Sequence, residues 1–227
     1  MKLRVSTKNS LVSAESMLKK SRLLPLLVFI FSIFSSDAGA EEYTYDHEKS
    51  RVSFTLRHLG IATVEGRFKT FSGSFSFDPK NLGASSVNIL IQPASVDSGS
   101  PTRNEDLRSE NFFAAEKYPE IRFESKKSTP TAPGHYKIEG DLTIRGITRS
   151  VVFKTELLTN PEELGDNAPV SFRSQTLIKR KDFNLGTGNW LDPLLFITDE
   201  TLKINLEVIG IPKKENPKTS PTAPFVA

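Results

Sequence analysis

Apolar and polar residues alternate along several segments of the chain, and this alternation is its strongest local pattern. In residues 51–58, for example, Val52, Phe54 and Leu56 alternate with polar residues. The same pattern recurs in residues 70–77, 86–92, 136–145 and 201–208, and in shorter pieces at residues 121–123, 151–157 and 170–178. A period of two is that of a β-strand with one buried face, so the pattern predicts about eight strands.

Strands that are apolar on one face only are typical of antiparallel sheets around a single interior. About eight of them predict a closed barrel or a sandwich. Helix signals are few. Thr102 and Glu105 have the spacing of a capping box, which predicts a short helix over residues 104–109, and Asn111 is a candidate cap for a further turn that ends before Pro119. The predicted fold class is therefore all-β and antiparallel, with one or two short helices.

The start of the chain predicts an export signal. Residues 23–34 are mostly apolar, which fits the hydrophobic region of a signal peptide and falls short of the ~20 residues that span a bilayer. Ala38-Gly39-Ala40 supplies the small residues of a cleavage site, so we expect residues 1–40 to be removed and the protein to be periplasmic or secreted. An uncleaved membrane anchor is the alternative. Met17 is an alternative to Met1 as the first residue, since it gives a leader of ordinary length.

The end of the chain predicts a tail without regular structure. Residues 212–227 contain four prolines and few apolar residues, a composition that favours disorder. Residues 41–211 then form one domain, which is long enough to bury one core.

The basic charge of the chain lies almost entirely in its first forty residues. The net charge is +3, but residues 1–40 hold six basic and two acidic residues, which leaves 24 basic and 25 acidic residues for the remainder. A near-neutral domain lacks the basic balance on which nucleic-acid binding depends. We therefore expect no nucleic-acid partner.

The residue types that carry most catalytic chemistry are scarce or scattered. The chain has no cysteine, which excludes disulfides, thiolate metal sites and cysteine nucleophiles. Its three histidines, His47, His58 and His135, show none of the short spacings of metal sites, and no Gly-x-Ser-x-Gly motif is present. We expect no metal, no other cofactor and no catalytic activity; an enzyme with an unrecognised site is the alternative.

Small residues interrupt the apolar faces of the predicted strands. Gly73, Gly140, Ser174 and Thr176 stand where bulky residues would fill a solid barrel. They indicate either an open cavity or, for the glycines, bulges and tight barrel corners. The predicted lining consists of residues that share the inward position of their strands: Phe54, Phe71, Gly73, Phe75, Ile89, Phe123, Ile138, Gly140, Leu142, Phe172, Thr176 and Ile178.

Two residues are candidates for contact with the polar end of a ligand. His58 and Arg180 fall at the ends of predicted strands, in register with the inward face. At the mouth of a cavity, either side chain would be placed to contact a ligand head. The alternative is that both are solvated, as charged and polar residues at strand ends usually are.

Several short motifs follow one another in order between residues 43 and 209. They are Tyr45-Asp46-His47, Arg57-His58-Leu59-Gly60 with Gly66-Arg67-Phe68, Ser95-Val96-Asp97-Ser98-Gly99, Leu107-Arg108-Ser109, Lys117-Tyr118-Pro119, Gly140-Asp141-Leu142-Thr143-Ile144 and Arg180-Lys181-Asp182-Phe183. Together they resemble the YceI-like family of bacterial extracytoplasmic lipid-binding proteins.

The resemblance implies an eight-stranded, lipocalin-like antiparallel barrel whose apolar tunnel holds polyisoprenoid chains, including quinone tails, without catalysis. On this basis we expect an isoprenoid or quinone-like lipid as the bound partner. Transient contact with a membrane is compatible with that role, and the oligomeric state stays open. A solid-cored barrel that acts as an interaction module is the alternative. Residues 190–197 are more apolar than the family pattern leads us to expect, and we interpret them as a lid or a surface patch.

Overall fold

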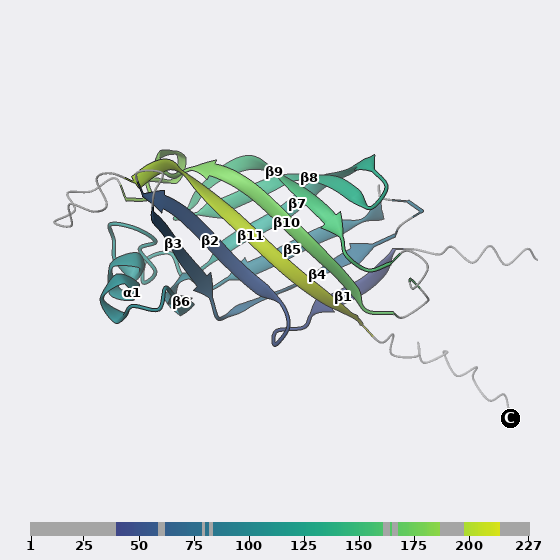
Figure 1. Cartoon of the computed structure of the whole chain (residues 1–227), viewed down its shortest axis with the longest axis horizontal. Coiled ribbons are helices and arrows are strands. Elements are labelled where there is room, and N and C mark those ends of the chain that lie inside the picture. The colour runs from purple at the N-terminus through teal and green to yellow at the C-terminus, as the bar shows by residue number, and fades with distance from the viewer. Residues whose placement is uncertain are drawn as a thin grey trace, which may run out of the picture. The chain divides into compact units, whose positions relative to one another are not determined.

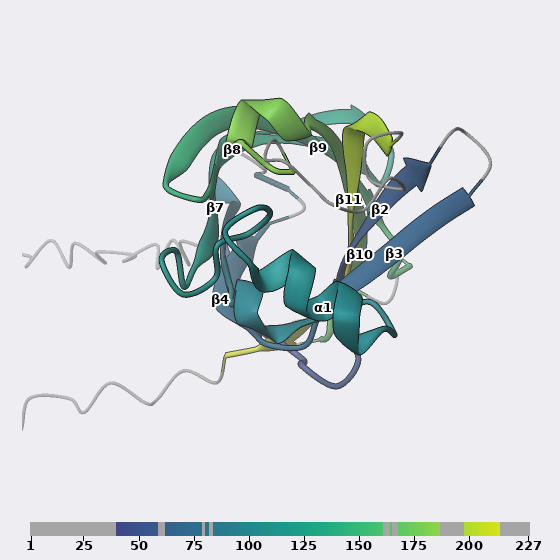
Figure 2. The same ribbon diagram turned by 90° about the vertical axis from the view of Figure 1, so that its left-hand side faces the viewer.

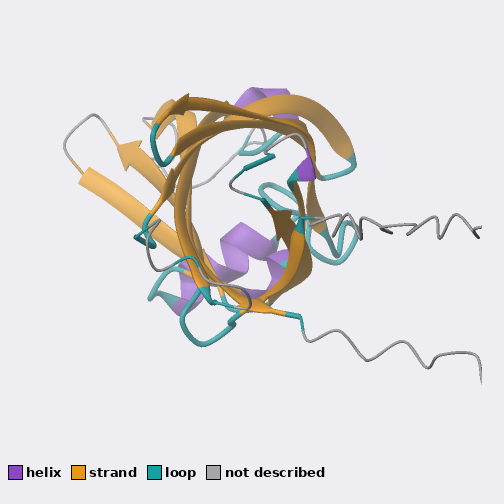
Figure 3. Cartoon of the chain, turned by 90° about the vertical axis from the view of Figure 1, so that its right-hand side faces the viewer, coloured by secondary structure: helices purple, strands orange, loops and turns teal. Residues whose placement is uncertain are grey.

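Eight antiparallel strands of the described chain close into a barrel. Hydrogen-bonded neighbours follow the order β1-β4-β5-β7-β8-β9-β10-β11, and β1 also pairs with β11, which completes the ring (Figure 3). The predicted all-β, eight-stranded antiparallel barrel is thus confirmed. With three further strands, the sheet consists of β1 (Glu41–Tyr45), β2 (Arg51–His58), β3 (Ala62–Phe68), β4 (Phe71–Phe77), β5 (Ser86–Ile91), β6 (Val96–Asp97), β7 (Ile121–Ala132), β8 (His135–Ile144), β9 (Ile147–Leu157), β10 (Val170–Lys179) and β11 (Thr198–Pro212).

The computed structural model describes residues 40–58, 62–78, 80–81, 84–160, 164, 168–186 and 198–213. The predicted signal peptide, the apolar run at residues 190–197 and most of the predicted tail lie outside this part. β11 extends to residue 212, where the tail was expected to begin, because its end pairs with β1.

β11 pairs with two different strands along one edge, and this fork shapes the barrel. Residues 210–212 pair with β1, whereas residues 202–207 pair with β2. From β2 the sheet continues through β3 to β6, so these three strands form an extension of the sheet. Figure 2 shows β2 and β3 leaving the ring.

The alternation did not predict β1, β3 and β6. β6 has two residues and β1 has five, which is too short for a clear period. β3 carries Gly66 where a strand with an apolar face would carry a bulky residue. The ring of Phe54, on the neighbouring strand β2, fills that position, and a Cβ atom on Gly66 would overlap it.

One α-helix, α1 (Pro101–Arg108), is present in the described residues, and it begins earlier than predicted. Ser100 is its N-cap, because the Ser100 hydroxyl accepts a hydrogen bond from the Arg103 backbone N–H. The predicted cap at Thr102 is therefore wrong, and residues 111–117 form turns rather than a second helix. No helix in the described ranges is long and apolar enough to cross a bilayer.

α1 and the loops beside it close one end of the barrel (Figures 1 and 2). Phe112, after α1, and Leu185, after the short helix η4 (Arg180–Phe183), are each 1% exposed. Arg145, in the turn between β8 and β9, donates hydrogen bonds to the backbone oxygens of Glu110 (2.8 Å) and Phe112 (2.7 Å). This end is sealed by packing and by hydrogen bonds together.

Candidate functional site

The interior of the barrel contains two small, neighbouring cavities. The larger one, of about 70 Å³, reaches toward the end opposite α1 and is called the distal cavity. The smaller one, of about 40 Å³, lies nearer α1 and is called the proximal cavity. Ile89 and Leu206 line both, so the two cavities adjoin. Apart from serines, the distal cavity is lined by Tyr45, Phe75, Phe77, Val87, Ile89, Tyr136, Ile138, Thr155, Phe172, Leu206 and Val208.

Aromatic rings form most of the wall of the distal cavity. The Phe172 ring contacts those of Phe75 and Phe77 edge-on, with centroids 5.8 and 5.0 Å away. Tyr45 packs on Phe75 at 5.5 Å, and Tyr136 meets Phe77 at 6.1 Å. Such edge-to-face arrangements are favourable, and they leave apolar ring surface toward the cavity.

Three buried hydroxyl groups of the wall are hydrogen-bonded within the wall itself. Thr155 on β9 and Ser174 on β10 are both buried, and their side-chain oxygens are hydrogen-bonded to each other. The buried Thr176 hydroxyl donates to the backbone oxygen of Val152 at 2.8 Å. Because these groups satisfy one another, the interior presents an apolar surface that suits a hydrocarbon and offers no charge to bind.

Tyr136 lines the distal cavity with its ring and carries a hydroxyl beside it, although almost no polar atom faces the cavity itself. Its side chain is partly buried, and its hydroxyl makes no hydrogen bond to the described residues. Burial raises the pKa of the Tyr136 phenol, so the group stays neutral and can donate a hydrogen bond. The neighbouring Tyr45 differs, because its hydroxyl donates to the Asn88 backbone oxygen at 3.2 Å.

Comparison with known proteins decides the family. A sequence model of the YceI-like domain matches residues 43–209. The chain belongs to the YceI-like family. Protein YceI of Escherichia coli O157:H7 is 36% identical over 170 residues, which cover 74% of this chain and 88% of the relative. A UPF0312 protein of Vibrio campbellii is 34% identical over 165 residues, 70% of this chain and 87% of the relative.

Several solved structures have the same fold. The crystal structure of BcnA from Burkholderia cenocepacia is 30% identical, has a TM-score of 0.65 and covers 73% of this chain and 98% of BcnA. A polyisoprenoid binding domain from Saccharophagus degradans is 16% identical, with a TM-score of 0.57, and covers 75% of this chain and 98% of that domain. At that identity, the second likeness concerns the fold alone.

The structure distributes the predicted lining of this YceI-like barrel over both cavities. Phe75, Ile138 and Phe172 line the distal cavity; Phe54, Phe123 and Leu142 line the proximal one; Ile89 lines both. Phe71 is buried beside the rings of Tyr45 and His47, outside both linings. Thr176 and Ile178 are buried in the wall where β9 and β10 separate.

The two glycines of the predicted lining lie against neighbouring backbone. A Cβ atom on Gly73, whose φ is +131°, would overlap the Asn88 backbone oxygen. A Cβ atom on Gly140 would overlap the Glu124 oxygen and lie 2.7 Å from the Phe123 ring, beside a register shift between β7 and β8. The glycines therefore permit close approach of neighbouring strands, which fits the alternative interpretation, and neither lines the distal or the proximal cavity.

Of the two residues predicted to contact the polar head of a ligand, the structure describes the side chain of Arg180 but not that of His58. The side chain of His58 lies outside the described residues. Arg180 begins η4 and is partly buried, and a Cβ atom on Gly186 would lie 2.7 Å from its Nη1. Burial lowers the pKa of the Arg180 guanidinium, and the charge of Glu200 opposes this shift. Arg180 lines neither cavity, so Tyr136 is the better-placed polar group.

Sequence reasoning missed several lining residues for identifiable reasons. Leu206 and Val208 lay on the predicted inward face of β11, and Tyr136 on that of β8, so the period-two pattern contained the signal to include them. Tyr45 was missed because β1 was not predicted, and Phe113 because it reaches the proximal cavity from a loop. Among the described residues, no three His, Cys, Asp or Glu side chains gather as a metal site requires.

Proposed function

We propose that this YceI-like protein is an exported carrier that binds a polyisoprenoid or a similar amphiphilic lipid, such as a quinone tail, inside its barrel. The observation that carries the proposal is the apolar interior, in which two adjoining cavities are lined by aromatic and aliphatic side chains. The Saccharophagus degradans domain of the same fold is described as polyisoprenoid binding, which supports this class of ligand. We further propose that export removes residues 1–40 and that the carrier acts in the periplasm or outside the cell.

Burial of the lipid's hydrocarbon chain provides the free energy of binding. Each CH₂ group removed from water contributes ~0.8 kcal/mol, so several isoprene units favour a dry interior over solvent. Ordering a flexible chain offsets part of this gain. Selectivity for chain length is then weak, because one unit more or less changes little polar contact. A head group at Tyr136 gives the interior a means to select among lipids.

The small size of the cavities implies that side chains move when a lipid enters. Together the two cavities hold less space than the ~150 Å³ pocket that accommodates benzene. A polyisoprenoid chain therefore needs the Phe75 and Phe172 rings to turn aside. The same observation favours the second candidate function, a solid-cored barrel that binds another protein, and one experiment separates the two.

The experiment adds a ring at the distal cavity. Val208 lines that cavity, whereas Ile211, on the same strand, is exposed. We expect wild-type protein to copurify with an extractable apolar lipid, and Val208→Phe to lose most of it because the added ring fills the cavity. Ile211→Phe is the matched control and should keep the lipid. Mass spectrometry of the organic extract gives lipid per protein.

Overpacking itself costs about 1–3 kcal/mol, so thermal melting must show that both variants are folded. Equal lipid content in folded Val208→Phe and wild type would place the ligand outside this cavity. Absence of lipid from wild type, with a protein retained in its place, would favour the interaction module.

A further inference from the structure

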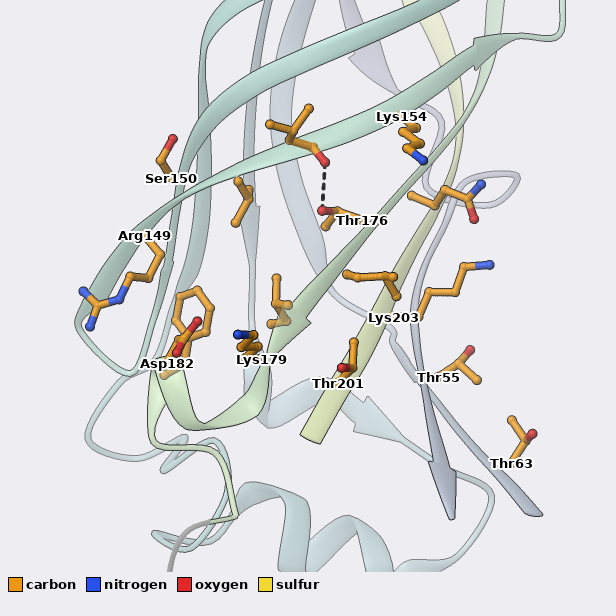
Figure 4. Close-up of a pocket in the computed structure, with 16 residues that line it drawn as sticks. Thr55, Thr63, Arg149, Ser150, Lys154, Thr176, Lys179, Asp182, Thr201 and Lys203 are labelled. Carbon is orange, nitrogen blue, oxygen red and sulfur yellow. Dashed lines mark hydrogen bonds between the residues drawn. The ribbon is translucent and has the colours of Figure 1, made fainter. Parts of the chain in front are cut away.

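The outer wall of the barrel carries a hollow that the interior site does not use. It spans β9, β10, β11 and the β2–β3 hairpin and has a volume of about 1050 Å³ (Figure 4). Its cause lies in the sheet, because β9 and β10 pair only through residues 154–157 and 172–175. Beyond Gln175 the strands diverge, and the Thr176 hydroxyl bonds the Val152 backbone oxygen in place of a ladder. We call this surface the outer hollow.

Two apolar side chains are exposed in the outer hollow. Leu177 is 67% exposed and Val152 is 44% exposed, and they come from the two strands that diverge. In the described part of the chain, Leu158 and Ile211 are the other large apolar side chains with comparable exposure. Apolar side chains gathered in one hollow mark a surface that contacts something other than water.

Basic side chains surround these apolar residues. Arg149 and Lys154 come from β9, Lys179 from β10 and Lys203 from β11, and Asp182 is the one acidic residue of the lining (Figure 4). Lys203 lies directly opposite Leu177 in the β10–β11 register. The outer hollow is thus strongly basic, although the chain after residue 40 is close to neutral.

Three carboxylates on or near these strands pair with basic residues outside the outer hollow, whereas Glu139, opposite Val152 on β8, makes no ion pair with another described residue. Arg173 forms two ion pairs, with 3.7 Å between its Nη1 and Glu156 Oε2 and 3.6 Å between its Nε and Glu207 Oε1. Lys181 Nζ lies 3.2 Å from Glu200 Oε2. Within the described ranges, the three lysines of the outer hollow make no ion pair, so their charges are available to a partner.

We propose that the outer hollow docks this protein on a bilayer surface that contains anionic lipids. Leu177 and Val152 enter the headgroup region, and the surrounding lysines extend toward the lipid phosphates. Exposed apolar side chains within a basic surface are characteristic of peripheral membrane contact. A nucleic-acid partner would use the charge but has less need of the apolar centre, and a protein partner is one outcome of the test. The inference concerns the outer face and holds whether or not the interior carries a lipid.

The first test measures binding to vesicles of phosphatidylcholine alone and to vesicles of phosphatidylcholine and phosphatidylglycerol in equal parts. The protein is expressed from the full sequence and purified with whatever processing the cell has carried out. Its N-terminus is established by intact mass. We expect binding to the anionic vesicles only. Removing three charges (Lys154→Gln, Lys179→Gln and Lys203→Gln) should weaken it on the order of 100-fold, since each lysine near an anionic surface contributes about fivefold.

The matched control removes three exposed lysines away from the outer hollow: Lys80→Gln, Lys117→Gln and Lys127→Gln. It lowers the total charge equally, and we expect it to bind nearly as well as wild type. Raising the salt from 0.01 M to 1 M, which shortens the screening length from about 30 Å to about 3 Å, should release the wild type.

A second test reads the apolar centre directly. The chain contains no cysteine, so Leu177→Cys carries an environment-sensitive dye at one defined position. Its emission should shift to the blue on anionic vesicles, whereas a dye on Leu158→Cys, exposed but outside the outer hollow, should not shift.

Three outcomes would overturn the proposal: no binding to anionic vesicles, equal losses for the two lysine triples, or equal dye shifts at positions 177 and 158. In that case the outer hollow belongs to a protein partner or to none. Lipid content of the interior is measured on the same samples, so failure of the docking surface is distinguishable from failure of the carrier function.

Discussion

The two ends of the barrel are built differently. At the α1 end, Phe112 and Leu185 are each 1% exposed, and Arg145 fixes the loop through two backbone oxygens. At the opposite end, Tyr136 and Val208 are only partly buried, and the Tyr136 hydroxyl has no partner among the described residues. The α1 end also borders the smaller cavity and the distal end the larger one.

This difference assigns stability and binding to different ends. Tightly packed rings at the α1 end resist displacement, because removing them leaves a void. Partly buried side chains at the distal end lose fewer packing contacts when they move aside for a ligand. We therefore expect a lipid to enter at the distal end, and substitutions at the two ends should separate folding from lipid content.

The largest effect is expected at the sealed end. Phe112→Ala should lower the free energy of unfolding by about 3–5 kcal/mol, because it opens a cavity in a fully packed site. Urea denaturation measures this loss, and lipid extraction from the folded fraction should give the wild-type content. A large loss of lipid with little loss of stability would reverse the assignment of the two ends.

Gly140→Ala should destabilise the barrel by about 1–3 kcal/mol, since the new methyl group overlaps the Glu124 backbone oxygen and the Phe123 ring. A larger residue here is expected to prevent folding rather than to block a tunnel. Glu139→Gln, the neighbouring residue on the other face of β8, is the control and should be near neutral in the same denaturation assay. Wild-type stability in Gly140→Ala would show that the two strands separate at little cost.

Burial of Tyr45 makes the barrel sensitive to alkaline pH. Burial raises the pKa of the Tyr45 phenol in the folded protein, whereas the unfolded chain titrates near pH ~10. Above that pH the unfolded state loses the proton first, so the free energy of unfolding should fall as pH rises.

Tyr45→Phe should weaken this dependence and remove the hydrogen bond to Asn88, at a cost of about 0.5–1.5 kcal/mol near neutral pH. Unfolding curves for both proteins across this pH range provide the measurement. An unchanged alkaline slope would mean that other tyrosines determine it.

The smallest effect concerns the phenol hydroxyl of Tyr136 at the distal end. Tyr136→Phe removes one hydrogen bond to a ligand head, which corresponds to roughly a two- to tenfold loss of affinity. We expect this loss for an isoprenoid with a carbonyl or phosphate head and not for a bare hydrocarbon of equal length. Titration of both ligands against wild type and Tyr136→Phe measures the two losses of affinity. Equal losses for the two ligands would mean that Tyr136 contributes through packing alone.

Sequence periodicity predicted the barrel well because each long strand has one buried face. It predicted the site less well, because period two gives the face of a residue but not its height along the barrel. Phe71 and Phe75 share a face of β4, yet only Phe75 lines a cavity. Gly140 illustrates a second limit: a small residue looks the same in sequence whether it leaves space or admits a neighbouring strand.

Arg180 shows a third limit of the sequence. Arg180 lies two residues after the inward-facing Ile178, so continued alternation predicted an inward position. The strand ends at Lys179, however, and η4 changes the direction of the chain. The outer hollow could not be predicted from the sequence either, because it depends on where β9 and β10 stop pairing. The alternation within each strand gives no information about that point.

Native mass spectrometry of protein purified from cells that express the full chain tests the central claim most directly. The account predicts a non-covalent adduct of lipid mass on the folded protein that disappears in organic solvent, with the adduct depleted in Val208→Phe and retained in Ile211→Phe. A bare polypeptide mass in wild-type protein, under conditions that preserve a known lipid complex measured alongside, would contradict it.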